Sequence, residues 1–118
     1  MDTPSALDRR LQSATGLDPQ EARQLLRQAT EEATQAPAYP LMQTLCRSLA
    51  EPNRLLITAL LKRNPDLSGA ELQAALGTAQ ATISHHLRVL HEAGLIEPTA
   101  DGKWTRYRLD PRYERLIP

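Results

Sequence analysis

The sequence predicts a mainly helical α+β domain that carries one small β-hairpin and is preceded by a helical extension. Through residues 4–92 the apolar side chains recur at spacings of three and four, as in amphipathic helices, whereas residues 95–109 alternate with a period of two. A chain of 118 residues suffices for one small hydrophobic core. Because no run of about 18 apolar residues and no secretion signal is visible, we expect a cytoplasmic protein without a membrane span.

Charge is balanced over the whole chain but not along it. The 14 Lys and Arg residues offset 14 Asp and Glu residues. A net charge of zero argues against a protein that coats nucleic acid through bulk electrostatics, but not against one that concentrates positive charge on one edge. Residues 103–112 hold four cations and one carboxylate. The positive end of the chain therefore lies near its C-terminus.

Residues 1–40 predict a helical extension, with a short helix near residues 4–14 and a longer one near 19–35. Asp18 can cap the longer helix, and Pro19 suits its first position. This helix carries a narrow apolar stripe that needs a partner surface, made of Ala22, Leu25, Leu26 and Ala29. Two prolines within residues 36–40 end the extension.

Two further helices are expected at residues 41–50 and 52–63, the second opened by Pro52 and closed by Asn64-Pro65. The first places Leu41, Leu45 and Leu49 on one face. The second is the expected core helix. Its inward side chains are predicted to be Leu55, Leu56, Ala59 and Leu60.

The next two helices have the pattern of a helix-turn-helix. Ser68 and Glu71 form a capping box, and Gly77 ends the short helix that follows. Thr78 is the expected cap of the next helix, which runs to Gly94. Its apolar side consists of Ile83, Leu87 and Leu90. Two short helices joined by a tight turn are typical of this motif.

A β-hairpin follows, with strands at 95–99 and 104–109 and an Asp-Gly turn. One face of its second strand carries Thr105, Tyr107 and Leu109, and the other carries Trp104, Arg106 and Arg108. We expect Trp104 to be a packing residue, and the alternative is that it stacks on a base. The predicted architecture is thus a winged helix-turn-helix at residues 41–110, with the extension at 1–40 and a short tail at 111–118 that forms about two helical turns.

The second helix of the motif is the candidate reader of DNA, since a helix fits the major groove and presents its polar side chains to base edges. The candidate contact residues on this helix are Gln80, Thr82, Ser84, His85 and Arg88. On the hairpin they are Lys103, Arg106 and Arg108, which suit phosphates or the neighbouring minor groove. The alternative for the helix is an ordinary solvated polar face.

Three ordered blocks make the sequence resemble the ArsR/SmtB family of winged-helix transcription regulators. They are Leu49–Leu55, Gln80–Leu90 and Glu92–Ile96, and the similarity covers about residues 41 to 110. The resemblance implies a homodimer that binds an inverted repeat in an operator, usually as a repressor released by a metal or another effector. It also implies a partly buried, hydrogen-bonding role for His86.

The family's metal sites are not matched. Ser68 and Ala70 stand where family metal sensors often carry two cysteines, and the chain stops at Pro118 without the C-terminal helix that bears a second family site. The three histidines, at positions 85, 86 and 91, include no pair at the i,i+4 spacing that chelates one ion. We therefore expect no metal site and no cofactor, and the effector stays open, as does a metal that bridges subunits.

Without a C-terminal helix, the dimer interface is expected to lie mainly within residues 1–45; the alternative is that the extension folds back on its own domain. The single cysteine, Cys46, is expected in the core, and the alternative is a redox switch through a disulfide between subunits.

We thus expect a sequence-specific double-stranded DNA-binding transcriptional regulator, a repressor that binds an inverted-repeat operator as a homodimer. An enzyme is not expected, because Ser84, His85, His86 and Glu92 share one short helix and no phosphate-binding loop accompanies them. The alternative is a winged helix that serves as a protein-protein interaction module.

Overall fold

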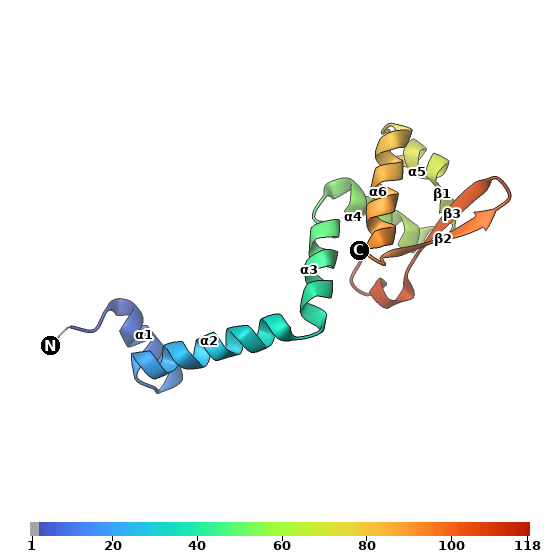
Figure 1. Cartoon of the computed structure of the whole chain (residues 1–118). Coiled ribbons are helices and arrows are strands. Elements are labelled where there is room, and N and C mark those ends of the chain that lie inside the picture. Colours follow the sequence, from blue (N-terminus) through green and yellow to red (C-terminus); the bar gives the residue numbers. More distant parts are fainter. Residues whose placement is uncertain (1–2) are drawn as a thin grey trace. The chain divides into compact units, whose positions relative to one another are not determined.

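A computed structural model describes residues 3–118. Its helices are α1 (Ala6–Thr15), α2 (Pro19–Gln35), α3 (Ala38–Leu49), α4 (Pro52–Arg63), α5 (Gly69–Leu76) and α6 (Gln80–Glu92). Its strands are β1 (Leu67–Ser68), β2 (Ile96–Asp101) and β3 (Trp104–Leu109), and a 3-10 turn follows at Pro111–Tyr113. The chain divides into two compact units, Met1–Leu41 and Met42–Pro118 (Figure 1). No helix within residues 3–118 is both long enough and apolar enough to cross a bilayer.

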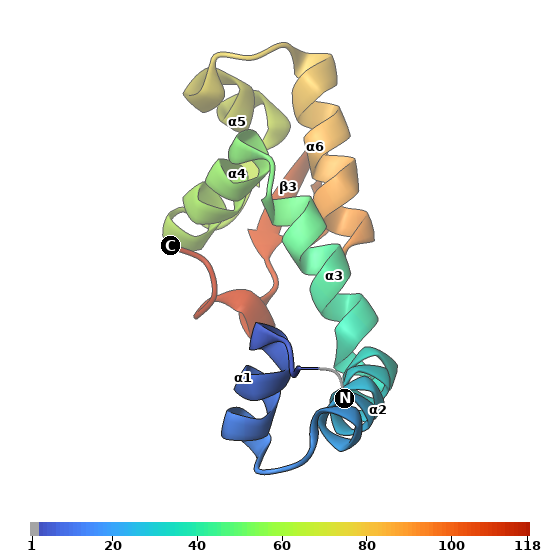
Figure 2. The same cartoon turned by 90° about the vertical axis from the view of Figure 1, so that its left-hand side faces the viewer.

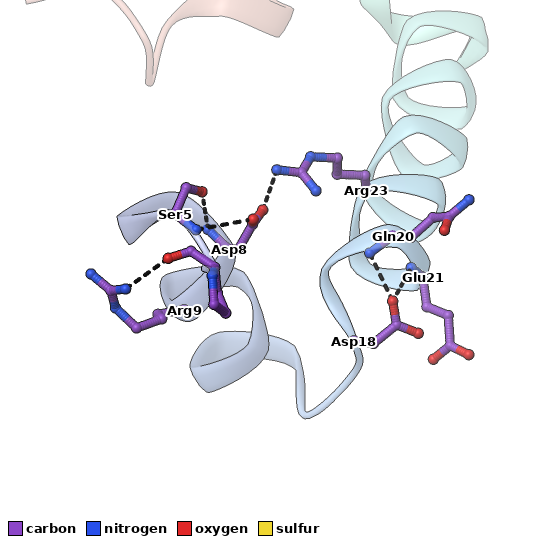
Figure 3. A network of polar contacts seen from close by, with 8 residues as sticks. Ser5, Asp8, Arg9, Asp18, Gln20, Glu21 and Arg23 are labelled. Atoms are coloured by element: carbon purple, nitrogen blue, oxygen red, sulfur yellow. Dashed lines mark hydrogen bonds and ion pairs between the residues drawn. The ribbon is translucent and has the colours of Figure 1, made fainter. Parts of the chain in front are cut away.

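The N-terminal unit is built around a hairpin of α1 and α2, which lie side by side in Figures 1 and 2. Ser5 and Asp8 form a capping box at the start of α1, and Asp18 caps α2 as expected. Asp8 also forms an ion pair with Arg23, which ties the two helices together (Figure 3). Only Ala22 is fully buried among residues 3–41. This unit therefore leaves most of its apolar surface exposed.

The second unit is the expected winged helix-turn-helix. Its three antiparallel strands have the order β1-β3-β2, and the hairpin of β2 and β3 extends beyond the helices (Figure 1). The hairpin matches the prediction, whereas β1 was not predicted; it pairs Leu67 with Tyr107. Helices α4, α5 and α6 all contact the sheet. The core consists of Leu45, Ile57, Leu61, Leu72, Ile83, Leu87, Leu90, Ala93, Leu95, Ile96, Leu109, Tyr113 and Ile117.

The prediction of the inward face of α4 was wrong. The buried residues of this helix are Ile57, Thr58 and Leu61, while Leu55 and Leu56 are exposed. The two remaining predicted core residues, Ala59 and Leu60, are only partly buried. Since α4 is apolar around most of its circumference, its spacing alone does not select the face that packs on α6 and β3.

Two local expectations also differ. Ala79, not Thr78, is the N-cap of α6, and it makes no side-chain cap. Thr78 Oγ1 is instead buried without a hydrogen-bond partner in the structure. Cys46 is exposed rather than in the core, because Leu45 and Ser48 of α3 take the buried positions.

The C-terminal residues belong to the core of the second unit. Only Pro111–Tyr113 are helical, as a single 3-10 turn instead of two helical turns. Tyr113 and Ile117 are nonetheless buried. Lys62 Nζ donates a hydrogen bond of 2.7 Å to the carbonyl oxygen of Ile117. This segment is therefore held against α4 by both apolar packing and a charge-assisted hydrogen bond.

Candidate nucleic-acid interface

Helix α6 has one face that packs in the core and one polar face that is exposed. Its buried side chains are Ile83, His86, Leu87 and Leu90. The five predicted contact residues of the helix, Gln80, Thr82, Ser84, His85 and Arg88, are all exposed. Arg88 Nη2 lies 3.1 Å from His85 Nδ1, so these two side chains share a hydrogen bond on the exposed side. Side chains of different lengths that can donate or accept hydrogen bonds thus lie along one face of a single helix.

The back of α6 is fixed to the junction of α3 and α4 through His86. Arg54 Nη1 lies 3.4 Å from His86 Nδ1, and Arg54 Nε donates a 2.6 Å hydrogen bond to the carbonyl oxygen of Ser48. A guanidinium group can only donate, so in this hydrogen bond His86 Nδ1 is the acceptor. Nε2 faces Glu51 Oε2 at 3.8 Å. The expected hydrogen bonding of His86 is confirmed, and the residue is more buried than expected, at 7% exposure. This contact orients the polar face of α6.

A groove of about 370 Å³ runs between α6, the start of α5 and the hairpin. Gln80 and Ser84 line it from α6, and Lys103 and Trp104 line it from the hairpin. The structure therefore brings two of the predicted helix residues together with one predicted hairpin residue, although β3 lies well after α6 in the chain.

The other two predicted hairpin cations are held by carboxylates. Arg106 Nε donates to Asp101 Oδ2 at 2.7 Å, and Arg108 donates to both carboxylate oxygens of Asp66, at 2.6 and 3.3 Å. The hydrogen bonds from Arg108 lower the pKa of Asp66, so this carboxylate stays ionised at more acidic pH than an ordinary aspartate does. The edge of the hairpin is consequently less positive than its arginines suggest.

Asp66 and Asp101 were not recognised as site residues from the sequence. Asp101 could have been found, because the antiparallel register places Thr99 opposite Arg106 and brings Asp101 close to it. Asp66 gives no such signal, since it lies 42 positions before Arg108. Its backbone is left-handed, with φ of 68°, a conformation that Asp tolerates better than most residues.

Within residues 3–118, no group of three or more His, Cys, Asp or Glu side chains is arranged to hold a metal ion. The rings of His85 and His86 are 5.9 Å apart, but His86 points to Arg54 and His85 to Arg88. Both histidines are thus engaged in hydrogen bonds with arginines.

Comparison with known proteins assigns the chain to a family. Residues 51–97 match the model of the bacterial regulatory protein arsR family. The chain is 31% identical over 80 residues to a helix-turn-helix transcriptional regulator of Methanocaldococcus jannaschii, covering 67% of this chain and 90% of that protein. It is 42% identical over 67 residues to the arsenical resistance operon repressor of Escherichia coli K12, covering 57% of each chain.

Among solved structures, the chain resembles a homodimeric winged helix-turn-helix DNA-binding domain from Mycobacterium bovis with a TM-score of 0.65 and 26% identity. The match covers 70% of this chain and 77% of that domain. The chain thus spans most of the archaeal regulator but little more than half of the Escherichia coli repressor. The proteins that it resembles are transcriptional regulators and not enzymes.

Proposed function

The chain belongs to the ArsR family of winged helix-turn-helix transcriptional regulators, and on that premise we propose that it represses transcription by binding an inverted-repeat operator as a homodimer. The observation that carries the proposal is the polar face of α6, which is exposed along five residues and adjoins a groove shared with the hairpin. Such a helix fits the major groove, with the hairpin beside the flanking backbone.

Base reading is assigned to Gln80, Thr82, Ser84 and His85, and phosphate contact to Arg88 and to the hairpin cations. All four base-reading residues lie in the first half of α6, which is the part of a recognition helix that approaches base edges. His85→Ala should weaken operator binding by about 1–3 kcal/mol and relax one base position. Equal losses on operator and random duplex would contradict base reading by His85.

The dimer is proposed to form mainly through residues 1–45. Several large apolar side chains are exposed there, namely Leu7, Leu25, Leu26, Tyr39, Leu41 and Met42. Surfaces of this kind mark interaction sites, and the Mycobacterium bovis relative is described as homodimeric. Packing of the extension on its own domain is the competing arrangement.

Two substitutions that each add a negative charge to α2 test this interface. Leu26→Glu places a carboxylate in the apolar stripe and should convert the dimer to a monomer in light scattering. Gln24→Glu adds the same charge on the other side of the helix and should leave the dimer intact. A dimer that survives Leu26→Glu removes this surface from the proposal.

Selection of bound duplexes from a random pool tests the function as a whole. Two reading helices related by a two-fold axis should select half-sites centred about 10 bp apart, and the affinity should fall as salt increases, because phosphate contacts release counterions. The carboxylates paired with Arg106 and Arg108 favour a second candidate, a protein-interaction module. That candidate predicts no selected sequence and little duplex binding even at low salt.

A further inference from the structure

Trp104 is the only tryptophan of the chain, and it is not packed in the core. Half of the accessible surface of this residue is exposed, at 50%. Tryptophan is usually well buried in small domains, because its ring contributes more apolar area than any other side chain. The expectation that Trp104 is a packing residue was therefore wrong, and its exposed ring needs another explanation.

The backbone around Trp104 is firmly placed. Trp104 is the first residue of β3 and pairs with Asp101, the last residue of β2, across a two-residue loop of Gly102 and Lys103. Gly102 has φ of 59°, as tight hairpin loops require. Because the ladder continues up to the loop, the ring is held at the end of the hairpin by a paired strand and not by a flexible segment.

The ring also adjoins the surface assigned to DNA. Trp104 lines the groove that contains Gln80 and Ser84, and it borders a second hollow of about 190 Å³ with Ala70 and Arg106. Lys103 Nζ lies 6.0 Å from the centroid of the ring, at the limit of a cation–π contact. An apolar ring and an ammonium group thus lie together next to the reading helix.

The charges of the hairpin explain why an apolar contact matters here. Arg106 and Arg108 are engaged by Asp101 and Asp66. Among the residues that the structure describes, Lys103 is the hairpin cation for which no carboxylate partner is found. Lys103 is thus the hairpin cation that can bind a phosphate without first leaving a carboxylate, and an apolar contact beside it would add binding free energy that does not depend on charge.

We propose that Trp104 is a DNA-contacting residue whose ring packs against a deoxyribose beside the groove read by α6, while Lys103 binds the adjacent phosphate. This inference rests on the proposed function. Packing on a sugar needs no separation of base pairs, whereas insertion between bases would cost a few kcal/mol of lost stacking. It also allows the ammonium group of Lys103 to stay next to the ring.

The full chain provides its own optical probe. The chain has one tryptophan and three tyrosines, so emission excited at the long-wavelength edge, where tyrosine barely absorbs, reports on residue 104 alone. Titration with the selected operator duplex should change this emission and saturate at the same stoichiometry as a gel-shift titration. An emission that depends on protein concentration without DNA would instead place the ring in a contact between protein chains, and that result overturns the proposal.

Two substitutions separate the apolar contact from the ionic one. Trp104→Ala should reduce operator affinity by about tenfold, in the range of aromatic contacts to nucleic acids, with the salt dependence unchanged. Lys103→Ala should also weaken binding, but should lower the slope of log K against log salt by about 1. Trp104→Phe keeps an apolar ring and should restore most of the affinity.

Leu116→Ala is the matched control, since Leu116 is a large apolar side chain outside the hairpin with a similar exposure of 56%. It should leave DNA affinity unchanged. The proposal is overturned if the wild-type chain binds the operator but Trp104→Ala binds equally well, or if the emission does not respond. A wild-type chain that binds no duplex removes the proposed function itself, and this inference with it.

Discussion

Neutralising Asp66 should make the protein bind DNA more tightly. The carboxylate of Asp66 accepts two hydrogen bonds from Arg108. The backbone carbonyl oxygen of Asp66 accepts a third hydrogen bond, from Arg106 at 3.0 Å. Asp66→Asn removes the negative charge and keeps the hydrogen bond from Arg106 to the backbone carbonyl oxygen. Asn also adopts the left-handed backbone of this position readily. The substitution therefore releases Arg108 for a phosphate with little effect on the fold.

The size of the effect follows from counterion release. Each phosphate contact contributes about 0.9 to the slope of log K against log salt. If Arg108 gains one contact, the slope for random duplex should steepen by about 0.9. The affinity ratio of Asp66→Asn to wild type should then grow about 3.5-fold when salt is lowered from about 200 to about 50 mM.

Fluorescence anisotropy of a labelled random duplex at four salt concentrations measures this slope. Asp18→Asn is the control, because it changes the net charge equally and retains a side chain that caps α2. A slope that is unchanged in Asp66→Asn would show that Arg108 does not reach DNA. An equal rise in both variants would show that only the overall charge of the protein matters.

Three further outcomes concern stability. Leu72→Ala should lower the free energy of unfolding by about 2–5 kcal/mol in urea denaturation, because Leu72 is completely buried; a change under about 1 kcal/mol would mean that the core there is loosely packed. Gly77→Ala should lower the free energy of unfolding by about 1–2 kcal/mol through the left-handed backbone alone, since an added Cβ meets no atom within 4 Å. A larger loss of stability would indicate a steric clash. The pKa of Asp66 is lowered by Arg108, so the ion pair stabilises the fold above the ordinary aspartate pKa of about 3.9 and is lost as pH falls through the lower folded value. Melting curves of wild type should therefore lose more stability below pH 4 than those of Asp66→Asn, and parallel curves would exclude this linkage.

Local signals in the sequence were sufficient to predict those structural features that are determined within one short segment. The capping box of Ser68 and Glu71 is present, α2 spans Pro19–Gln35 as expected, and the hairpin forms around Asp101 and Gly102. In each case a side chain satisfies its own backbone or a glycine permits a turn, so neighbouring residues suffice for the prediction.

Features that depend on distant partners could not be predicted in this way. The inward face of α4 is chosen by packing on α6 and β3, and the short strand β1 has too few residues for a periodic signal. In the candidate site, the exposed face of α6 followed from helical periodicity. The pairing of Arg108 with Asp66 and the exposed position of Trp104 depend instead on how the sheet joins the helices.

The anchored C-terminal segment sets a limit on how the chain can be shortened. A chain that ends at Asp110 would lose the buried rings and branches of Tyr113 and Ile117 and would leave Lys62 without its carbonyl acceptor. Residues 111–118 therefore pack against α4 and help to cover the core. Removal of the residues after β3 would therefore expose part of the hydrophobic core to water.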